Sequence, residues 1–294
     1  MARSWTDRLQ HFDRRWIFVI MGLALLVPFL WPLRLPIRVS AKVKAAYYAV
    51  EDLHPGDVVL VSLDFDPASK PELKPFLRAV LLQLKRKEVK IVFVTTWYAA
   101  PPLMDRYIRE MVDQPIAREG DGYTGKPDRA YVRNVDYVWL GFREGREATI
   151  ASMGKDLWGT FDQRANDGTA LAQIPMMQGR KALADFDLLV LVSAGYPGTK
   201  EYVQLVQTRY DLKMITACTA VSLTDLAPYY DAGQLLGLVG GMGGAAEYEQ
   251  MVGRRDDGAQ GADALNTGYL VVITAIVLGN VIYFAGRRRG GRRA

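Results

Sequence analysis

The chain has 294 residues, of which 50% are apolar and 23% are charged, so it can bury a large core and intrinsic disorder is excluded. One cysteine, Cys218, and two distant histidines, His11 and His54, exclude an intrachain disulfide and a zinc site of the usual Cys/His kind. The net charge of +5 equals the contribution of five arginines near the C-terminus and therefore gives no indication of nucleic-acid binding: Arg287, Arg288, Arg289, Arg292 and Arg293.

The first apolar block runs from Trp16 to Leu33 without a charged residue. As a helix it would be about 27 Å long, against a bilayer hydrocarbon core of about 30 Å. Trp31 lies near its end, where aromatic rings prefer the headgroup region, and Pro28 and Pro32 would kink or end the helix there. The block predicts a first transmembrane helix over residues 16–33.

A cleaved signal peptide is the alternative for this block. The nearest pattern of small residues that suits cleavage, Val39 to Ala41, comes well after Leu33. An uncleaved signal-anchor is therefore favoured.

The second apolar block runs from Thr267 to Gly286, with Tyr269 and Tyr283 near its ends, and contains no charged residue. Its length and composition predict a second transmembrane helix over residues 267–286.

Orientation follows from the positive charges, because Lys and Arg close to a span stay on the cytoplasmic side. The tail at 287–294 and the four arginines within residues 1–15 place both termini in the cytoplasm of a bacterial inner membrane. Residues 34–266 then form an extracytoplasmic domain. A competing basic cluster follows the first block on the outer side: Arg34, Arg38, Lys42 and Lys44.

The domain between the blocks alternates strand and helix patterns. Short continuous apolar runs predict buried parallel strands at 58–65, 89–96, 135–142, 187–193 and 213–221. Helical periodicity or helix-start residues predict helices at 40–53, 72–88, 101–112, within 145–159 and at 198–210, and residues 113–129 suit a loop. This alternation predicts an α/β domain with a mostly parallel, doubly wound, Rossmann-like sheet.

A glycine-rich segment from Asp231 to Val252 precedes the second block. A spacing of four residues puts its small side chains on one side of a helix, and such a face lets another helix approach closely. The segment lacks the G-x-G-x-x-G pattern after a strand and a Walker lysine. It predicts a helix-packing surface made of Gly233, Gly237, Gly241 and Ala245.

Candidate ligand-binding residues follow the predicted strands, because ligands of parallel sheets bind beyond the carboxyl ends of the strands. The first, second and fourth strands lead into polar side chains and glycines, and the fourth leads into a helix start. We expect ligand contacts from Asp64, Asp66, Thr96, Trp97, Ser193, Gly195 and Thr199.

Asp64 and Asp66, with Thr95 or Thr96 after the next strand, resemble the motifs of haloacid-dehalogenase-type phosphatases. The resemblance implies that Asp64 is a nucleophile, that Asp66 is an acid/base and that a threonine binds phosphate. The later acidic pair of that pattern should follow a strand, whereas the acidic residues near position 187 precede one. Magnesium would therefore lack a ligand. Helix capping by the two aspartates is the simpler interpretation.

The segment GQLLGLVGGMGGAAEYE, from Gly233 to Glu249, also resembles a group of bacterial membrane proteins that place an α/β domain beside one or two spans. The resemblance extends over most of residues 130–285. It implies bacterial origin and a membrane location, and it implies no activity.

These observations favour a non-enzymatic, membrane-anchored α/β protein that binds a ligand or partner and assembles with itself or with other membrane proteins. No cofactor, metal or nucleic acid is expected. A membrane-tethered phosphohydrolase that uses Asp64 and Asp66 is the alternative. A channel or transporter is a third class, possible with two spans only as an oligomer.

Overall fold

The computed structural model describes residues 13–117 and 127–290. The chain divides into two compact units, one formed by Ile37–Ala259 and the other by Met1–Pro36 with Gln260–Ala294. The first unit is the α/β domain, and the second contains the apolar helices.

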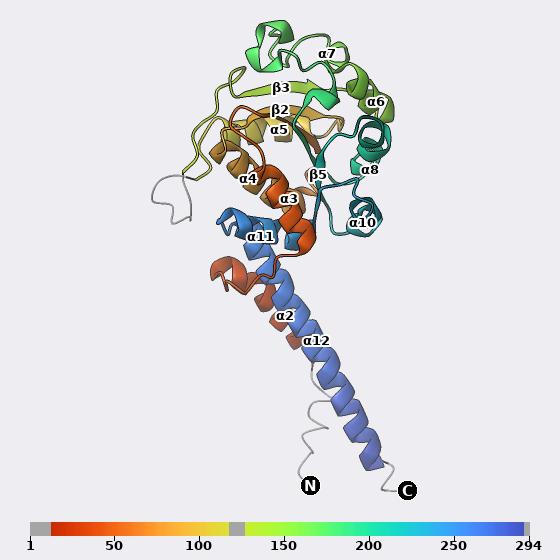
Figure 1. Cartoon of the computed structure of the whole chain (residues 1–294). Helices are drawn as coiled ribbons and strands as arrows, with labels where there is room; N and C mark the ends of the chain where they lie inside the picture. The colour runs from red at the N-terminus through yellow and green to blue at the C-terminus, as the bar shows by residue number, and fades with distance from the viewer. Residues whose placement is uncertain (1–12, 118–126, 291–294) are drawn as a thin grey trace. The chain divides into compact units, whose positions relative to one another are not determined.

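The α/β domain is built on six parallel strands in the order β3-β2-β1-β4-β5-β6 (Figure 1). This order belongs to doubly wound folds, in which the direction of winding reverses between β1 and β4. The five predicted strands and the parallel sheet are confirmed. The strands are β1 (Val58–Asp64), β2 (Lys90–Thr95), β3 (Tyr137–Phe142), β4 (Leu188–Ser193), β5 (Met214–Cys218) and β6 (Gly237–Gly240).

The sixth strand corrects the prediction of one helix over the glycine-rich segment. Gly237 lies in β6, Gly241 begins helix α11 (Gly241–Val252), and Gly233 lies in the preceding turn. Of the four small residues, only Gly241 and Ala245 therefore lie in one helix. Gly237 packs so closely that an added Cβ would lie 2.3 Å from the Cα of Ala46, because β6 passes directly against helix α3 (Ala41–Glu51).

Helices cover both faces of the sheet, because alternate strand residues face opposite sides. Val59 and Val61 belong to the core on one face, and Val58 and Leu60 belong to the core on the other. The first face is covered by α3, α4 (Lys70–Arg86), α5 (Pro101–Tyr107), the π-helical turn η1 (Ile108–Val112) and α11.

The second face is covered by shorter segments. They include α6 (Glu147–Lys155), α7 (Leu157–Thr160), the continuous run of α8 (Thr199–Tyr202), η5 (Val203–Gln207) and α9 (Thr208–Tyr210), and α10 (Leu223–Asp231). Three short 3-10 turns complete the list: η2 (Leu171–Gln173), η3 (Pro175–Met177) and η4 (Leu183–Asp185).

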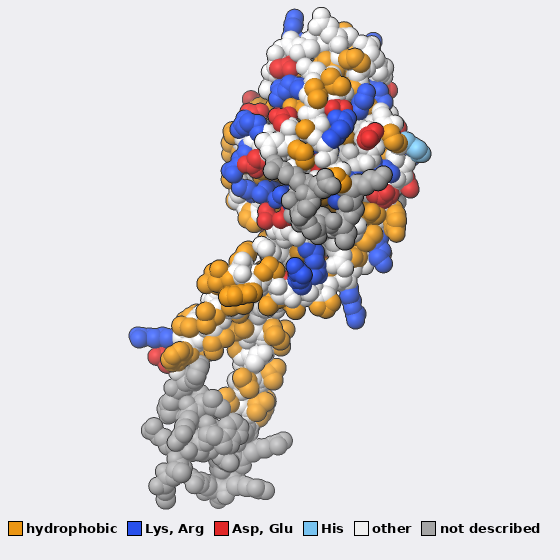
Figure 2. All heavy atoms as spheres, turned by 90° about the vertical axis from the view of Figure 1, so that its left-hand side faces the viewer, with side chains coloured by type: hydrophobic (Ala, Val, Ile, Leu, Met, Phe, Trp, Pro, Cys, Tyr) orange, Lys and Arg blue, Asp and Glu red, His pale blue; other side chains and the backbone are white. Residues whose placement is uncertain are grey.

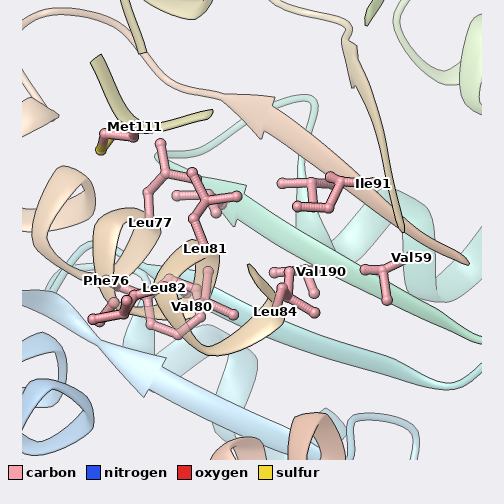
Figure 3. Close-up of a cluster of buried hydrophobic side chains, with 14 of the residues drawn as sticks. Val59, Phe76, Leu77, Val80, Leu81, Leu82, Leu84, Ile91, Met111 and Val190 are labelled. Atoms are coloured by element: carbon pink, nitrogen blue, oxygen red, sulfur yellow. The ribbon is translucent and has the colours of Figure 1, made fainter. Parts of the chain in front are cut away.

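Helix α4 is the center of the first core. It starts with a proline in its first turn and ends with Lys85 and Arg86, which suit the negative end of the helix dipole. Figure 3 shows its apolar side chains packed toward Val59, Ile91 and Val190 of three neighbouring strands. The other predicted helices are also present, although part of the expected loop at 113–129 lies outside the described residues.

The second unit contains α2 (Arg14–Leu30) and most of α12 (Asp257–Gly290). Within the described residues, one helix, Asp257–Phe284, is long and apolar enough to cross a membrane by length and composition. Such a helix is therefore present at the second predicted span, whereas the apolar helix at the first, Arg15–Leu30, is shorter. Helix α2 ends at Leu30 rather than Leu33 because Trp31 precedes Pro32 and takes an extended conformation. The tails at 1–12 and 291–294 lie outside the described residues.

Candidate functional site

Asp64 closes β1 at the carboxyl edge of the sheet, beside Ser193 of β4. Its carboxylate has 0% exposure and accepts hydrogen bonds from the Thr96 amide and hydroxyl at 2.8 Å each and from the Ser62 hydroxyl at 2.6 Å. The Ser62 hydroxyl also lies 3.0 Å from the phenol oxygen of Tyr202. Burial raises the pKa of Asp64 to about 6, although the hydrogen bonds from Ser62, Thr96 and Thr95 act to lower it.

Asp66 serves a different purpose. Its Oδ1 accepts hydrogen bonds from the amide of Ser69 at 3.0 Å and from the Ser69 hydroxyl at 3.1 Å. The side chain thus stabilises the turn that leads into α4. Asp64 and Asp66 hold local backbone and hydroxyl groups, and neither is the N-cap residue of α4, which is Ser69.

The predicted residues after β2 also take part in local contacts. Thr95 donates its hydroxyl to the Leu63 carbonyl, and the Trp97 indole donates to the Pro197 carbonyl at 2.6 Å. Trp97 thereby ties the loop after β2 to the loop after β4. Tyr98, next in sequence, is exposed.

An open pocket of about 300 Å³ lies beyond the carboxyl ends of β4 and β5. It lies at the edge of the sheet where ligands of this architecture bind, one strand away from the reversal of winding between β1 and β4. Three of the predicted ligand residues line it, namely Ser193, Gly195 and Thr199. The full lining is Ser193, Gly195, Tyr196, Thr199, Lys200, Glu201, Ser222, Asp225 and Leu226.

The loop from Ser193 to Thr199 forms one wall of this pocket. A Cβ on Gly198 would lie 2.0 Å from the Ser193 hydroxyl oxygen and 2.2 Å from the Gly195 carbonyl oxygen, so the loop can fold back this tightly only with glycine there. The Gly198 amide donates to Glu201 Oε2 at 2.8 Å, which fixes the start of α8. The Thr199 hydroxyl pairs with that of Thr216 on β5 at 2.6 Å.

The structure separates the predicted ligand residues into two groups. Ser193, Gly195 and Thr199 line the pocket, whereas Asp64 and Thr96 bind each other inside the fold. A phosphohydrolase nucleophile needs an oxygen open to substrate, and the buried Asp64 presents none. No observation at this edge therefore favours the phosphohydrolase alternative.

Sequence reasoning missed six residues of the pocket. The fifth strand ends at Cys218 instead of continuing to Val221, so the helix start that follows was overlooked. The sequence signal was the spacing of Ser222 and Asp225, which is typical of a helix N-terminus. The missed residues are Tyr196, Lys200, Glu201, Ser222, Asp225 and Leu226.

Within the part of the chain that the structure describes, no group of three or more His, Cys, Asp or Glu residues could hold a metal ion. Comparison of the chain with models of protein families, with curated proteins and with solved structures found no match in any of the three.

Proposed function

We propose that this chain is a membrane-anchored binding protein of the bacterial inner membrane, with both apolar helices in the bilayer and both termini in the cytoplasm. Its α/β domain takes a ligand at the carboxyl edge of the sheet. The chain assembles with itself or with other membrane proteins through its spans. The proposal rests above all on one hydrogen bond between the two apolar helices.

That hydrogen bond runs from the Thr267 hydroxyl in α12 to the Ala24 carbonyl in α2, at 2.6 Å. Pro28 lies four residues after Ala24 and has no N–H, so it cannot supply the donor that this carbonyl receives in a regular helix. In hydrocarbon, where no water replaces the missing donor, a side chain from a neighbouring helix must do so. The pairing of Pro28 with Thr267 therefore suits two helices that lie together in lipid.

Further contacts in the same unit support this pairing. An added Cβ on Gly268 would lie 3.0 Å from the Leu25 side chain, so a small residue allows the close approach. Near the end of α2, Asp263 accepts hydrogen bonds from the Arg34 amide at 3.0 Å and the Leu35 amide at 3.3 Å. Hydrogen bonds thus join α12 to α2 itself and to the segment that follows α2. Helix α2 has 17 residues and is followed by Trp31 in an extended conformation. Paired with α12, this helix and the extended residues after it would together be long enough to span the bilayer.

The outer surfaces of both helices also suit lipid. On the face in view, Figure 2 shows hydrophobic side chains along the described parts of these helices. A continuous apolar surface of this kind is rare on soluble monomers. The exposed large residues include Trp16, Phe18, Leu26 and Phe29 in α2 and Leu270, Ile273, Ile276, Val277 and Phe284 in α12.

Membrane fractionation of the full chain tests the anchoring. We expect the chain to stay in the membrane pellet after alkaline carbonate extraction and to enter solution only with detergent. A variant that consists of residues 37–259 alone, without the apolar helices, should be released by the carbonate extraction. Recovery of the intact chain in the soluble fraction without detergent would contradict the proposal.

Protease accessibility tests the sidedness. Protease added to spheroplasts should digest the domain at 37–259 while a tag on the C-terminal tail stays protected. Digestion of the domain only in inverted vesicles would place it in the cytoplasm instead and overturn the proposed orientation.

A further inference from the structure

The pocket beyond β4 and β5 has a buried floor and an exposed rim of different chemistry. The floor consists of side chains with little exposure, namely Ser193, Thr199, Glu201 and Leu226. The rim consists of Gly195, Tyr196, Lys200 and Asp225, which are exposed. A ligand would therefore meet different groups at its inner and outer ends.

Glu201 determines the character of the floor. The residue is only 8% exposed, and its Oε2 is held by the Gly198 amide at 2.8 Å. Among residues 13–117 and 127–290, the other oxygen, Oε1, has no hydrogen-bond partner, and it is not one of the fully buried unpartnered atoms, so it stays accessible to solvent. A nearly buried carboxylate that lines a pocket with one oxygen accessible and without a protein partner favours a ligand that brings a hydrogen-bond donor, and a cationic donor most of all.

The other polar groups of the floor do not offset this charge. The Ser193 hydroxyl donates to the Gly195 carbonyl at 3.3 Å. The lone pairs of the Ser193 hydroxyl oxygen can therefore accept hydrogen bonds from a ligand. The Thr199 hydroxyl is engaged with that of Thr216. Leu226 adds an apolar side. The floor thus accepts hydrogen bonds, and an ammonium group matches it.

The rim carries one cation and one anion, Lys200 and Asp225, where the outer end of a ligand would lie. Lys200 is exposed at the pocket, and the Arg146 guanidinium lies 5.7 Å from the center of the Tyr196 ring. Asp225 is the anionic residue of the rim. A carboxylate on the ligand can pair with Lys200 while the Tyr196 ring covers its apolar part.

We propose that this pocket binds a small zwitterion with the chemistry of a free amino acid, its ammonium group on Glu201 and its carboxylate on Lys200. The volume of about 300 Å³ matches the lower end of ligand pockets and thus a molecule of that size. This inference rests on the ligand-binding half of the proposed function and adds the class of ligand.

Calorimetric titration of the full chain in detergent tests the assignment. Common L-amino acids are titrated singly, and the tightest is compared with its amine analogue, which lacks the carboxylate, and with its acid analogue, which lacks the amine. We expect the zwitterion to bind best, the amine more weakly and the acid least. Preference for the acid, or no heat with any amino acid, would overturn the inference.

Two substitutions test the positions of the two charges. Glu201→Gln keeps an oxygen for the Gly198 amide but removes the negative charge, so affinity for the zwitterion and the amine should fall at least about tenfold. Lys200→Gln should weaken binding of the zwitterion and leave that of the amine unchanged. Unaltered affinity in both variants would contradict the assignment.

Two further variants separate a local effect from loss of the fold. Asp52→Asn removes an exposed carboxylate beyond the end of α3 and should bind like the native chain. Ser222→Trp fills the pocket without changing a charge and should abolish binding while the urea midpoint stays near that of the native chain. Full binding by Ser222→Trp would show that the ligand lies elsewhere. If every amino acid fails to bind but carbonate extraction retains the chain in membranes, the ligand inference alone fails.

Discussion

Lys85 shows how a single charged residue can be held inside this core. Its ammonium group has no exposure and lies 2.7 Å from the Asp128 carboxylate, and it donates to the carbonyls of Met111 at 3.0 Å and Gln114 at 2.7 Å. Asp128 in turn accepts from the amide of Ile116 at 3.0 Å. Burial lowers the pKa of Lys85, and the carboxylate of Asp128 opposes that change.

Substitution of Lys85 should therefore lower the free energy of unfolding by more than the net contribution of the Lys85–Asp128 ion pair to stability. In Lys85→Met the Asp128 carboxylate stays buried without a counter-charge, and we expect the free energy of unfolding to fall by about 3–5 kcal/mol. The double variant Lys85→Met with Asp128→Asn should recover part of this loss. Urea unfolding of the solubilised chain measures both, and an equal loss in the two variants would refute the charge argument.

Glu249 provides a pH-dependent contribution to stability. The residue is buried, and its carboxylate accepts hydrogen bonds from the amides of Asp256 at 2.9 Å, Gly258 at 3.0 Å and Ala259 at 2.9 Å, around the first turn of α12. Burial raises its pKa to about 7, against the opposing effect of these amides. The folded protein therefore binds this proton more tightly than the unfolded chain does.

The sign of the pH effect follows from that difference. Between about pH 4.5 and 7 the folded state holds more protons than the unfolded state, so the free energy of unfolding should fall as pH rises through this range, by on the order of 1–3 kcal/mol. Glu249→Gln should flatten this slope, whereas Glu247→Gln on the same helix should leave it. Urea titrations at several pH values provide the comparison. Asp64, whose pKa is raised to about 6, contributes a slope of the same sign, so part of the slope should remain in Glu249→Gln. A slope that is entirely unchanged would contradict the assignment to Glu249.

At the scale of elements, the contact between α2 and α12 can be measured by a double-mutant cycle. Thr267→Val removes the hydroxyl that serves the Ala24 carbonyl and should destabilise the helix pair by about 1 kcal/mol. In a Pro28→Ala background the carbonyl regains its donor within α2, so the same change should cost less. Unfolding in mixed micelles measures the four variants. Equal costs in both backgrounds would contradict the role given to Thr267.

The contact between β6 and α3 is a second test at this scale. Gly237→Ala would place a methyl group 2.3 Å from the Ala46 backbone, and overpacking of this kind should cost at least about 1–3 kcal/mol. Gly243→Ala in α11 is the matched control, because the added Cβ would meet no neighbouring atom within 4 Å. Alanine also stabilises a helix relative to glycine, by up to about 1 kcal/mol. Thermal unfolding should rank the control above the native chain and Gly237→Ala below it. An unchanged midpoint for Gly237→Ala would refute the close approach.

At the scale of the whole molecule, assembly depends on what the spans present to lipid. Asn280 lies exposed within the apolar part of α12. It follows Gly279, where an added Cβ would meet no atom of another element within 4 Å. An amide in hydrocarbon gains by pairing with an amide of another span.

We therefore expect the detergent-solubilised chain to form oligomers and Asn280→Leu to shift it toward the monomer. Light scattering coupled to size exclusion measures the mass, with Val277→Leu as the control on the same helix. A monomer at all concentrations for the native chain would contradict self-assembly.

The sequence by itself determined the elements whose signal is local. Continuous apolar runs identified β1 to β5, and the composition of Thr267–Gly286 identified the apolar part of α12, because burial on both faces or in lipid demands apolar residues at every position. It also identified part of the pocket, since Ser193 and Thr199 follow a strand end. Strand β6 was missed because its four residues, half of them glycines, carry neither a β-branched run nor alternation.

Only the tertiary structure decided which strand ends lie next to each other and which polar atoms remain without a protein hydrogen-bond partner. Asp64 and Glu201 are both acidic residues near strand ends, yet one is surrounded by donors from β1 and β2 while the other keeps an oxygen toward the pocket. Thr267 and Ala24 are 243 residues apart, and no local pattern pairs them. Such pairings depend on the strand order and on how helices approach one another, and these properties arise from packing of the whole chain rather than from any segment of it.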